Sequence, residues 1–341
     1  MAICPHCEQD AGDARFCPVD GTPLAHLDHP GPGRELTAGD HVDGRYLIEA
    51  ELGRGGMGIV YLAKSAALGE VAVKVLSPAS AMRQTTVGRF AREARLASRM
   101  DHPHLVRVYE FGFDPAGYYF LVMEVLEGRS LYALLHEEAP LAPGRALRIL
   151  EQVASALARA HALGVVHRDM KAENVMIRPL DGEHVTVMDF GLSRTEASWG
   201  GALMTSEGQL VGTPTYMAPE QWRGEVAGPA ADIYAFGVLA YELLCGHPPF
   251  PGTNVVELMR AHTGREAPPL SKQRTRGAVG RRLESLVHHC LVKSEDGRPP
   301  SMEAVHARIE QELTARLART WRAGDVAPGG GLRARGRDAL R

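Results

Sequence analysis

The 341-residue chain lacks any apolar run of the roughly 18 residues needed to span a bilayer. Its first ten residues, MAICPHCEQD, are polar and lack the apolar core of a signal peptide. An excess of basic charge is also missing, because 38 Lys and Arg stand against 41 Asp and Glu. The sequence therefore predicts a cytoplasmic protein that binds neither a membrane nor nucleic acid.

Cysteine is scarce and unevenly placed. Cys4, Cys7 and Cys17 lie at the N-terminus, while Cys245 and Cys290 stand alone in apolar surroundings. In a reducing compartment, clustered cysteines favour a metal site over a disulfide. The two isolated cysteines are expected to be buried as small hydrophobic side chains.

Composition shifts divide the chain into four parts. Residues 1–25 are short, turn-rich and cysteine-bearing, and residues 26–44 are rich in Pro and Gly, as in a linker. Residues 45–317 have a continuous globular pattern, and residues 318–341 form a Gly/Arg-rich tail that we expect to be disordered. No internal repeat is found.

The globular part predicts an α+β chain with two lobes, a β-rich lobe over residues 45–125 and a helical lobe over residues 126–317. Short β-rich runs with glycine punctuation predict strands at 45–53, 58–66, 70–76, 105–113 and 118–126, with one helix at 90–100 between them. Apolar residues at three-to-four spacing then predict helices at 146–164, 231–246, 282–293 and 302–320.

Residues 53–60, GRGGMGIV, lie between two predicted strands. A dinucleotide-binding turn needs a helix directly after its glycines, so this stretch instead predicts a hairpin flap whose backbone N–H groups approach phosphates. Lys74 follows in VAVK, an apolar strand where an ammonium group needs an anionic partner. Phosphate oxygens and Glu93 are candidate partners.

Three more motifs follow in order: HRDMKAEN at 167–174, DFG at 189–191 and GTPTYMAPE at 212–220. Together with the flap and VAVK, they resemble the eukaryotic-like protein kinase family, and in particular its bacterial serine/threonine branch. The resemblance covers roughly residues 46–315 and implies the two-lobed protein kinase fold. It also implies transfer of the γ-phosphate of ATP to Ser or Thr hydroxyls of protein substrates.

The family pattern implies a role for each polar residue of these motifs. Lys74 would hold the α- and β-phosphates, with Glu93 fixing its ammonium group, and Asp189 and Asn174 would ligate Mg²⁺ or Mn²⁺. Asp169 would accept the proton of the attacking hydroxyl, and Lys171 would balance charge on the phosphoryl group.

The resemblance also implies an ATP-binding set, although its apolar members could equally be plain core residues. Besides Lys74 and Glu93, this set contains Leu52, Gly53, Gly55, Gly56, Gly58, Val60, Ala72, Met123, Glu124, Val125 and Met176. Glu220 would pair with Arg298 in the core, and Asp232 would accept hydrogen bonds from the catalytic loop.

Arg168, directly before Asp169, is typical of kinases that are controlled by phosphorylation of the loop between DFG and APE. Thr205 and Ser206 lie where bacterial relatives autophosphorylate, with Thr195 and Ser198 as further hydroxyls. The alternative is an ordinary flexible loop.

Residues 4–20, CPHCEQDAGDARFCPVD, resemble a zinc ribbon in which Asp stands at the expected fourth cysteine. Cys4, Cys7, Cys17 and Asp20 would hold a structural Zn²⁺, with His6 as an alternative ligand. A metal-free arm is the other possibility. The segment would serve docking or regulation.

Two rival functions fit the sequence less well. A pseudokinase usually loses the lysine or one of the aspartates, yet Lys74, Asp169, Asn174 and Asp189 are all present. A kinase of small molecules is disfavoured by residues 213–220, which match the family's platform for peptide substrates.

Overall fold

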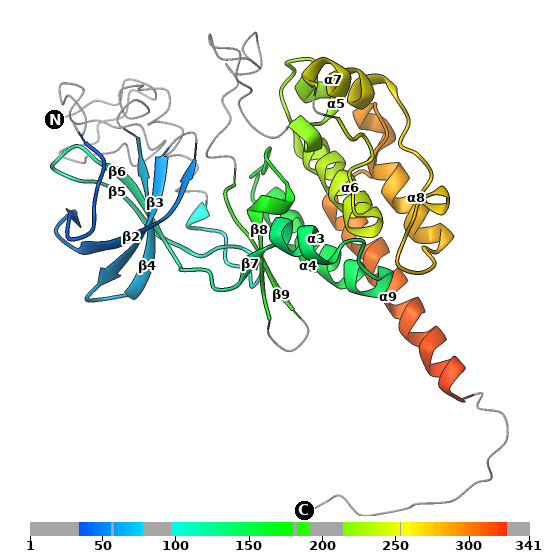
Figure 1. The fold of residues 1–341 in the computed structure, drawn as a ribbon, viewed down its shortest axis with the longest axis horizontal. Helices are drawn as coiled ribbons and strands as arrows, with labels where there is room; N and C mark the ends of the chain where they lie inside the picture. The colour runs from blue at the N-terminus through cyan, green and yellow to red at the C-terminus, as the bar shows by residue number, and fades with distance from the viewer. Residues whose placement is uncertain are drawn as a thin grey trace, which may run out of the picture.

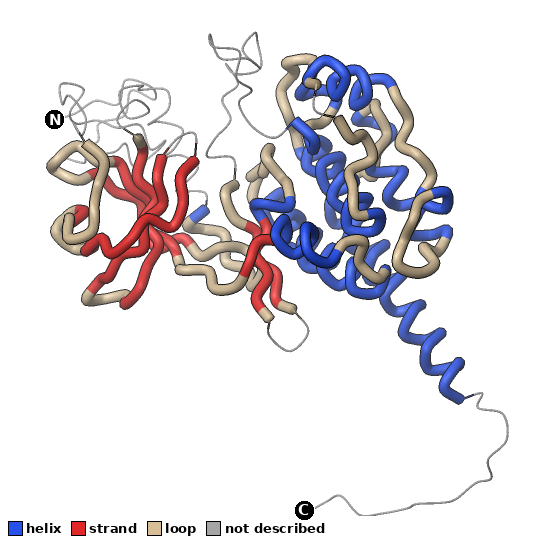
Figure 2. Tube along the Cα trace, viewed as in Figure 1, coloured by secondary structure: helices blue, strands red, loops and turns tan. Residues whose placement is uncertain are grey.

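The computed structural model describes residues 34–55, 58–77, 97–179, 183–190, 214–252 and 254–325. The chain forms a β-sheet lobe and a helical lobe with a small sheet beside the helices (Figures 1 and 2). This arrangement confirms the predicted α+β organisation.

The N-terminal lobe is one antiparallel sheet of six strands in the order β1-β2-β3-β4-β6-β5. Its strands are β1 His41–Val42, β2 Tyr46–Gly55, β3 Gly58–Ser65, β4 Gly69–Leu76, β5 Val108–Phe113 and β6 Tyr119–Met123. Tyr46, Ile48, Val73 and Phe120 are buried together on one side of this sheet. At the start of β2, buried and half-buried residues alternate over 46–49, as expected of a sheet with one packed face.

The helical lobe has its core around α6, Pro229–Cys245, which is apolar around most of its circumference and almost wholly buried. It begins at a proline and ends at Gly246, whose positive φ of 79° suits a left-handed cap. Cys245 and Cys290 are both buried in this lobe, as predicted. The surrounding helices are α3 Leu131–Glu138, α4 Pro143–Ala162, α5 Pro219–Trp222, α7 Val255–Gly264, α8 Arg281–Cys290 and α9 Met302–Asp325.

A three-stranded sheet lies where the helical lobe faces the N-terminal lobe (Figure 1). It consists of β7 Arg129–Ser130, β8 Val175–Arg178 and β9 His184–Val187. The short helix η1, Ala172–Asn174, directly precedes β8. The Val106 N–H donates to the Val187 carbonyl at 3.0 Å, and this contact connects the two lobes. Further 3-10 turns are η3 Pro214–Tyr216, η4 Leu270–Lys272 and η5 Glu295–Gly297.

The described part of the predicted linker, residues 34–44, packs onto the N-terminal sheet. β1 pairs with β2, and Leu36 and Val42 are buried in the same cluster as Tyr46. These residues thus belong to the folded lobe and do not only connect it to the N-terminal segment. The other predicted domain boundaries stay predictions.

All five predicted strands of the large part, and its four predicted helices from residue 146 onward, are confirmed within a few residues at each end. The predicted helix at 90–100 lies almost entirely outside the described residues. Among the described helices, none has an apolar stretch long enough to cross a bilayer.

Candidate active site

The glycine-rich stretch forms the hairpin predicted from its sequence. Gly53 pairs with Val60 and Gly55 with Gly58 across β2 and β3. A Cβ atom at Gly58 would lie 2.0 Å from the Val75 carbonyl oxygen, so no side chain fits there. Gly56 and Met57 lie outside the described residues.

Arg54, within this flap, is bound by a carboxylate from the segment that precedes the sheet. Its guanidinium contacts Glu35 at 2.6 and 3.0 Å and Glu51 at 2.9 Å. Glu35 precedes the buried Leu36, which anchors the segment. Sequence reasoning missed Glu35, because no local pattern connects it to a hairpin almost twenty residues away.

Lys74 lies on β4 and points its ammonium group at the end of β9. Its Nζ is 2.5 Å from Asp189 Oδ1, although 115 residues separate the two. Only 12% of the Lys74 side chain is exposed. Lys74 thus has the anionic partner that was expected for an ammonium group in an apolar strand, and this partner is Asp189. The predicted partner Glu93 lies outside the described residues.

Asp189 is ionised at neutral pH. Burial raises the pKa of its carboxyl, but the charges of Lys74, His167 and Lys171 and the hydrogen bond from Lys74 together outweigh burial, so the net pKa lies below the ordinary value. Its φ of 59° is uncommon for a residue with a side chain, and such outliers gather at functional sites.

Asp169 is surrounded by the other polar residues of the HRDMKAEN motif. Lys171 Nζ lies 3.0 Å from Asp169 Oδ2. Asn174 Nδ2 donates to the Asp169 carbonyl at 2.8 Å, and Asn174 is buried on η1. A backbone hydrogen bond connects this motif to Asp189, because the Met188 N–H donates to the Asn174 carbonyl at 3.0 Å and Met188 directly precedes Asp189.

Asp232 holds the catalytic loop in its conformation, as the sequence predicted. It accepts hydrogen bonds from the backbone N–H groups of His167 and Arg168, both at 2.7 Å. Arg168 has a φ of 63°, a left-handed conformation that costs free energy and needs such support. His161 Nε2 also lies 2.7 Å from Asp232.

Two of these supporting residues were missed by sequence reasoning. His161 lies on the amphipathic helix α4, where its position does not distinguish it from a packing residue. Gln221 donates to the Arg168 carbonyl at 3.1 Å, and its only signal was its place after Glu220.

The predicted pair of Glu220 and Arg298 is present, with two contacts of 2.7 Å between fully buried side chains.

Members of the predicted ATP-binding set lie on strands of both sheets. Ala72 on β4 and Met123 on β6 are cross-strand partners, and Met176 lies on β8. The Glu124 N–H donates to the Arg107 carbonyl at 3.0 Å. Of the two backbone groups of Glu124, only the carbonyl could therefore form a hydrogen bond with the adenine ring of ATP. Half of Leu52 is exposed. Their contact with adenine stays a prediction.

The remaining predicted site residues lie outside the described part of the chain. They are the activation-loop candidates Thr205 and Ser206 and the N-terminal candidates Cys4, Cys7, Cys17 and Asp20.

The described residues fit a magnesium ion. Asp189 offers an ionised carboxylate, and because Asn174 Nδ2 is committed to the Asp169 carbonyl, the amide oxygen is the atom that can meet a cation. Carboxylate and amide oxygens are the hard ligands that Mg²⁺ prefers. An ammonium group, two carboxylates and an amide thus converge between the lobes.

Comparison with known proteins agrees with this geometry. A family model described as the protein kinase domain matches residues 46–309. The chain is 39% identical over 283 residues to the serine/threonine-protein kinase pkn3 of Myxococcus xanthus, covering 82% of this chain and 52% of that protein. It is 36% identical over 281 residues to the serine/threonine-protein kinase PrkC of Bacillus subtilis, covering 82% of this chain and 42% of that protein.

Among solved structures, the chain is similar to the crystal structure of the PknI kinase domain of Mycobacterium tuberculosis. The TM-score is 0.62 at 29% sequence identity, covering 81% of this chain and 99% of that one. The chain belongs to the protein kinase family, and the kinase fold predicted from its motifs is confirmed. It spans about half the length, or less, of the curated relatives named above.

Proposed function

We propose that the protein is an ATP-dependent serine/threonine protein kinase. The observation that carries this proposal is the convergence of Lys74, Asp169, Asn174 and Asp189 on one site, through the contacts Lys74–Asp189 and Asn174–Asp169 and the Met188–Asn174 backbone bond. All the relatives named above carry the name serine/threonine-protein kinase or kinase domain. A pseudokinase would be expected to lack one of these groups.

The proposed reaction needs positioning more than covalent chemistry. The oxygen of a substrate Ser or Thr hydroxyl forms a bond to the γ-phosphorus, and the bond from that phosphorus to the β–γ bridging oxygen breaks, releasing ADP. Asp169 orients the hydroxyl and accepts its proton. Lys171, 3.0 Å from Asp169, lies where it can meet the charge on the transferred group.

Lys74 and the cation ligands act on the nucleotide. Lys74 would bind the α- and β-phosphates, exchanging part of its contact with Asp189 for contacts with phosphate oxygens. Asp189 and Asn174 would hold Mg²⁺ or Mn²⁺, which neutralises phosphate charge when bound. The flap would cover the phosphates with its backbone N–H groups.

The test is transfer of radiolabel from ATP to the protein itself and to a generic acceptor protein. Asp169→Asn removes the proton acceptor and Lys74→Met removes the phosphate contact, so each should lower the transfer rate by about 10²-fold or more. Transfer at the wild-type rate by either variant would contradict the proposal.

Lys64→Met is a matched control. Lys64 lies on the neighbouring strand β3 but is exposed and paired with Glu49, so its removal should leave the rate unchanged. Thermal unfolding of all three variants separates loss of chemistry from loss of fold.

We further propose that the protein autophosphorylates its activation loop at Thr205 or Ser206. The support is Arg168, placed beside Asp169 where a phosphate on that loop can pair with it. Mass spectrometry after incubation with Mg²⁺ and ATP would map the modified residues. Phosphate only at other positions would contradict these two sites.

The N-terminal proposals rest on sequence alone. Cys4, Cys7, Cys17 and Asp20 would hold a structural Zn²⁺ in a segment over residues 1–25 that docks a partner. Cys4→Ser should lower the zinc bound per chain, as measured by metal analysis, and unchanged zinc would dismiss the site.

Four further statements stay predictions. They are a cytoplasmic location, a kinase domain over residues 45–317, a disordered tail after it, and no binding of nucleic acid or membrane.

A further inference from the structure

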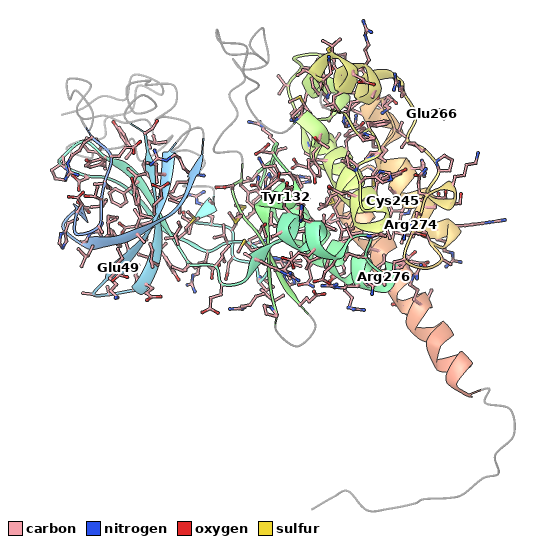
Figure 3. The ribbon with its side chains drawn as sticks, viewed as in Figure 1. Glu49, Tyr132, Cys245, Glu266, Arg274 and Arg276 are labelled. Carbon is pink, nitrogen blue, oxygen red and sulfur yellow. The ribbon has the colours of Figure 1, made fainter. Side chains whose placement is uncertain are left out.

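The chain between α7 and α8 concentrates positive charge in an otherwise slightly acidic protein. Residues 265–282, termed here the basic segment, contain a single acidic residue, Glu266. Their cationic side chains are all exposed and are Arg265, Lys272, Arg274, Arg276, Arg281 and Arg282. Figure 3 shows Arg274 and Arg276 on the helical lobe, far from the N-terminal sheet.

The cations of the basic segment have no side-chain partner in the described part of the chain. Across the described residues, none of its six cations forms a side-chain hydrogen bond or ion pair. Elsewhere, arginines are held by carboxylates, as the exposed Arg45 is by Glu110 and the half-buried Arg129 is by Glu138. Clustered cations without partners repel one another, and this cost favours binding of an anion from outside the chain.

Part of the basic segment borders a hollow. Arg281 and Arg282 open α8, and together with Arg308 on α9 they line a space of about 400 Å³. The buried Leu283 and Leu286 form its apolar floor. Glu312 also lines the hollow, but it is itself bound by Arg316 at 3.1 Å.

The backbone of α8 adds to this positive field. Its N-cap is Gly280, which provides no side-chain acceptor for the first N–H groups of the helix. These groups carry partial positive charge and point toward the same end of the helix as the two arginines.

We propose that the basic segment and this hollow form a docking surface for an acidic polypeptide segment of a partner protein. Arginine forks match carboxylates in two-point contacts, and the leucine floor suits an apolar side chain between acidic ones. Nucleic acid fits less well, because the residues that line the hollow include no aromatic side chain on which a base could stack. The surface binds its partner independently of phosphate transfer.

The test is binding of a fluorescein-labelled peptide of alternating Glu and Leu to the full chain, followed by fluorescence anisotropy. Arg281→Glu combined with Arg282→Glu should weaken binding about ten-fold or more, since two attractive contacts become repulsive. The affinity of the wild type should fall as salt rises from ~0.05 to ~0.5 M.

The matched control is Arg99→Glu combined with Arg178→Glu, which gives the same net charge by changing exposed residues outside the basic segment. It should bind the peptide like the wild type. Equal weakening in both double variants would overturn the proposal, as would absence of peptide binding to the wild type. Tighter binding of a single-stranded DNA of equal charge would also overturn it, in favour of nucleic acid.

If the double variant unfolds, Arg308→Gln tests the opposite wall of the hollow. It should weaken peptide binding about three-fold, since it removes a charge without creating one. Unchanged affinity in a folded Arg308→Gln protein would contradict the proposal.

Discussion

Asp189 and Lys74 come from different lobes, and each is the other's charge partner at 2.5 Å. The contact neutralises two partly buried charges, which the proposed function assigns to the phosphates and the cation. Asp169 likewise has a charge partner, Lys171, and its backbone carbonyl accepts a hydrogen bond from Asn174. At the residue scale, the candidate site is thus built from opposite charges that neutralise one another.

The ion pair of Asp189 predicts a dependence of stability on pH. Because the folded-state pKa of this carboxyl is lowered, the pair stabilises the fold above the ordinary aspartate pKa of about 4 and loses this contribution as the pH falls through the folded-state value. The difference in free energy of unfolding between the wild type and Asp189→Asn should therefore shrink as the pH falls from ~6 to ~3 in urea titrations. A difference that grows on acidification would contradict the pair.

The buried pair of Glu220 and Arg298 predicts a large loss of stability when only one partner is changed. Glu220→Gln leaves the Arg298 guanidinium buried without its counter-charge, which should cost about 3–5 kcal/mol in the free energy of unfolding. Thermal or urea unfolding measures this loss.

The exposed pair of Arg223 and Glu225 is the control for that measurement. Its contact at 2.7 Å is as short as those of the buried pair, but both side chains face solvent. Glu225→Gln should leave stability unchanged within error. An equal loss of unfolding free energy in Glu220→Gln and Glu225→Gln would show that burial of the ion pair does not determine how much its disruption destabilises the fold.

At the scale of elements, the residues proposed to be catalytic lie on short segments that are held in place by longer elements. Asp169 and Asn174 lie between α4 and β8, and Asp189 lies at the end of β9. The central helix α6 holds residues 167 and 168 through Asp232, and α4 packs against α9.

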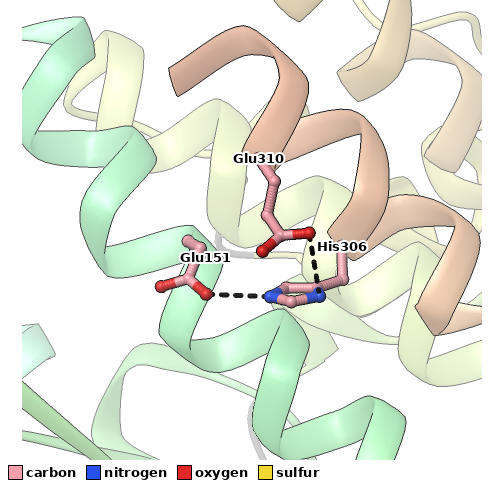
Figure 4. Close-up of side chains that lie close together, drawn as sticks. All are labelled: Glu151, His306 and Glu310. Atoms are coloured by element: carbon pink, nitrogen blue, oxygen red, sulfur yellow. Dashed lines mark hydrogen bonds and ion pairs between the residues drawn. The ribbon is translucent and has the colours of Figure 1, made fainter. Parts of the chain in front are cut away.

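The helices α4 and α9 are joined by a histidine that lies between two carboxylates (Figure 4). His306 Nε2 lies 2.8 Å from Glu151 on α4, while its Nδ1 lies 3.9 Å from Glu310 on α9 itself. The first contact crosses between helices and is half-buried, whereas Glu310 is exposed. Only the contact between His306 and Glu151 should therefore hold α9 against α4.

His306→Ala should lower the free energy of unfolding by about 1 kcal/mol and speed hydrogen exchange in α9. Hydrogen-exchange mass spectrometry measures this by segment. Glu310→Ala should have a smaller effect, because its contact is longer and stays within one helix. A larger effect of Glu310→Ala would mean that the contact between the helices does not hold α9.

For the whole molecule, the packing of residues 34–44 predicts where the folded unit begins. A chain of residues 34–325 should fold, whereas residues 45–325 lose the buried Leu36 and Val42. Removing two such side chains costs about 3 kcal/mol or more, so the shorter chain should unfold at a clearly lower temperature in thermal scans. Equal unfolding temperatures would show that this segment adds nothing to the lobe.

The sequence singled out the motif residues because the chemistry proposed for them needs particular side chains in a fixed order. It predicted the long strands and helices because their apolar periodicity is strong. It could not show that Glu35 contacts Arg54, or that His161 and Gln221 hold the catalytic loop. These contacts join segments whose separation in the chain carries no pattern.

The sequence alone determined the family, the two lobes and the set of charged residues between them, since each depends on residue type and local order. The tertiary structure decided which carboxylate meets Lys74 and that the residues before the sheet belong to it. It also left the cations of residues 265–282 without a side-chain partner among the residues that the structure describes. These outcomes depend on distances between remote segments, and such distances are set only when the whole chain packs.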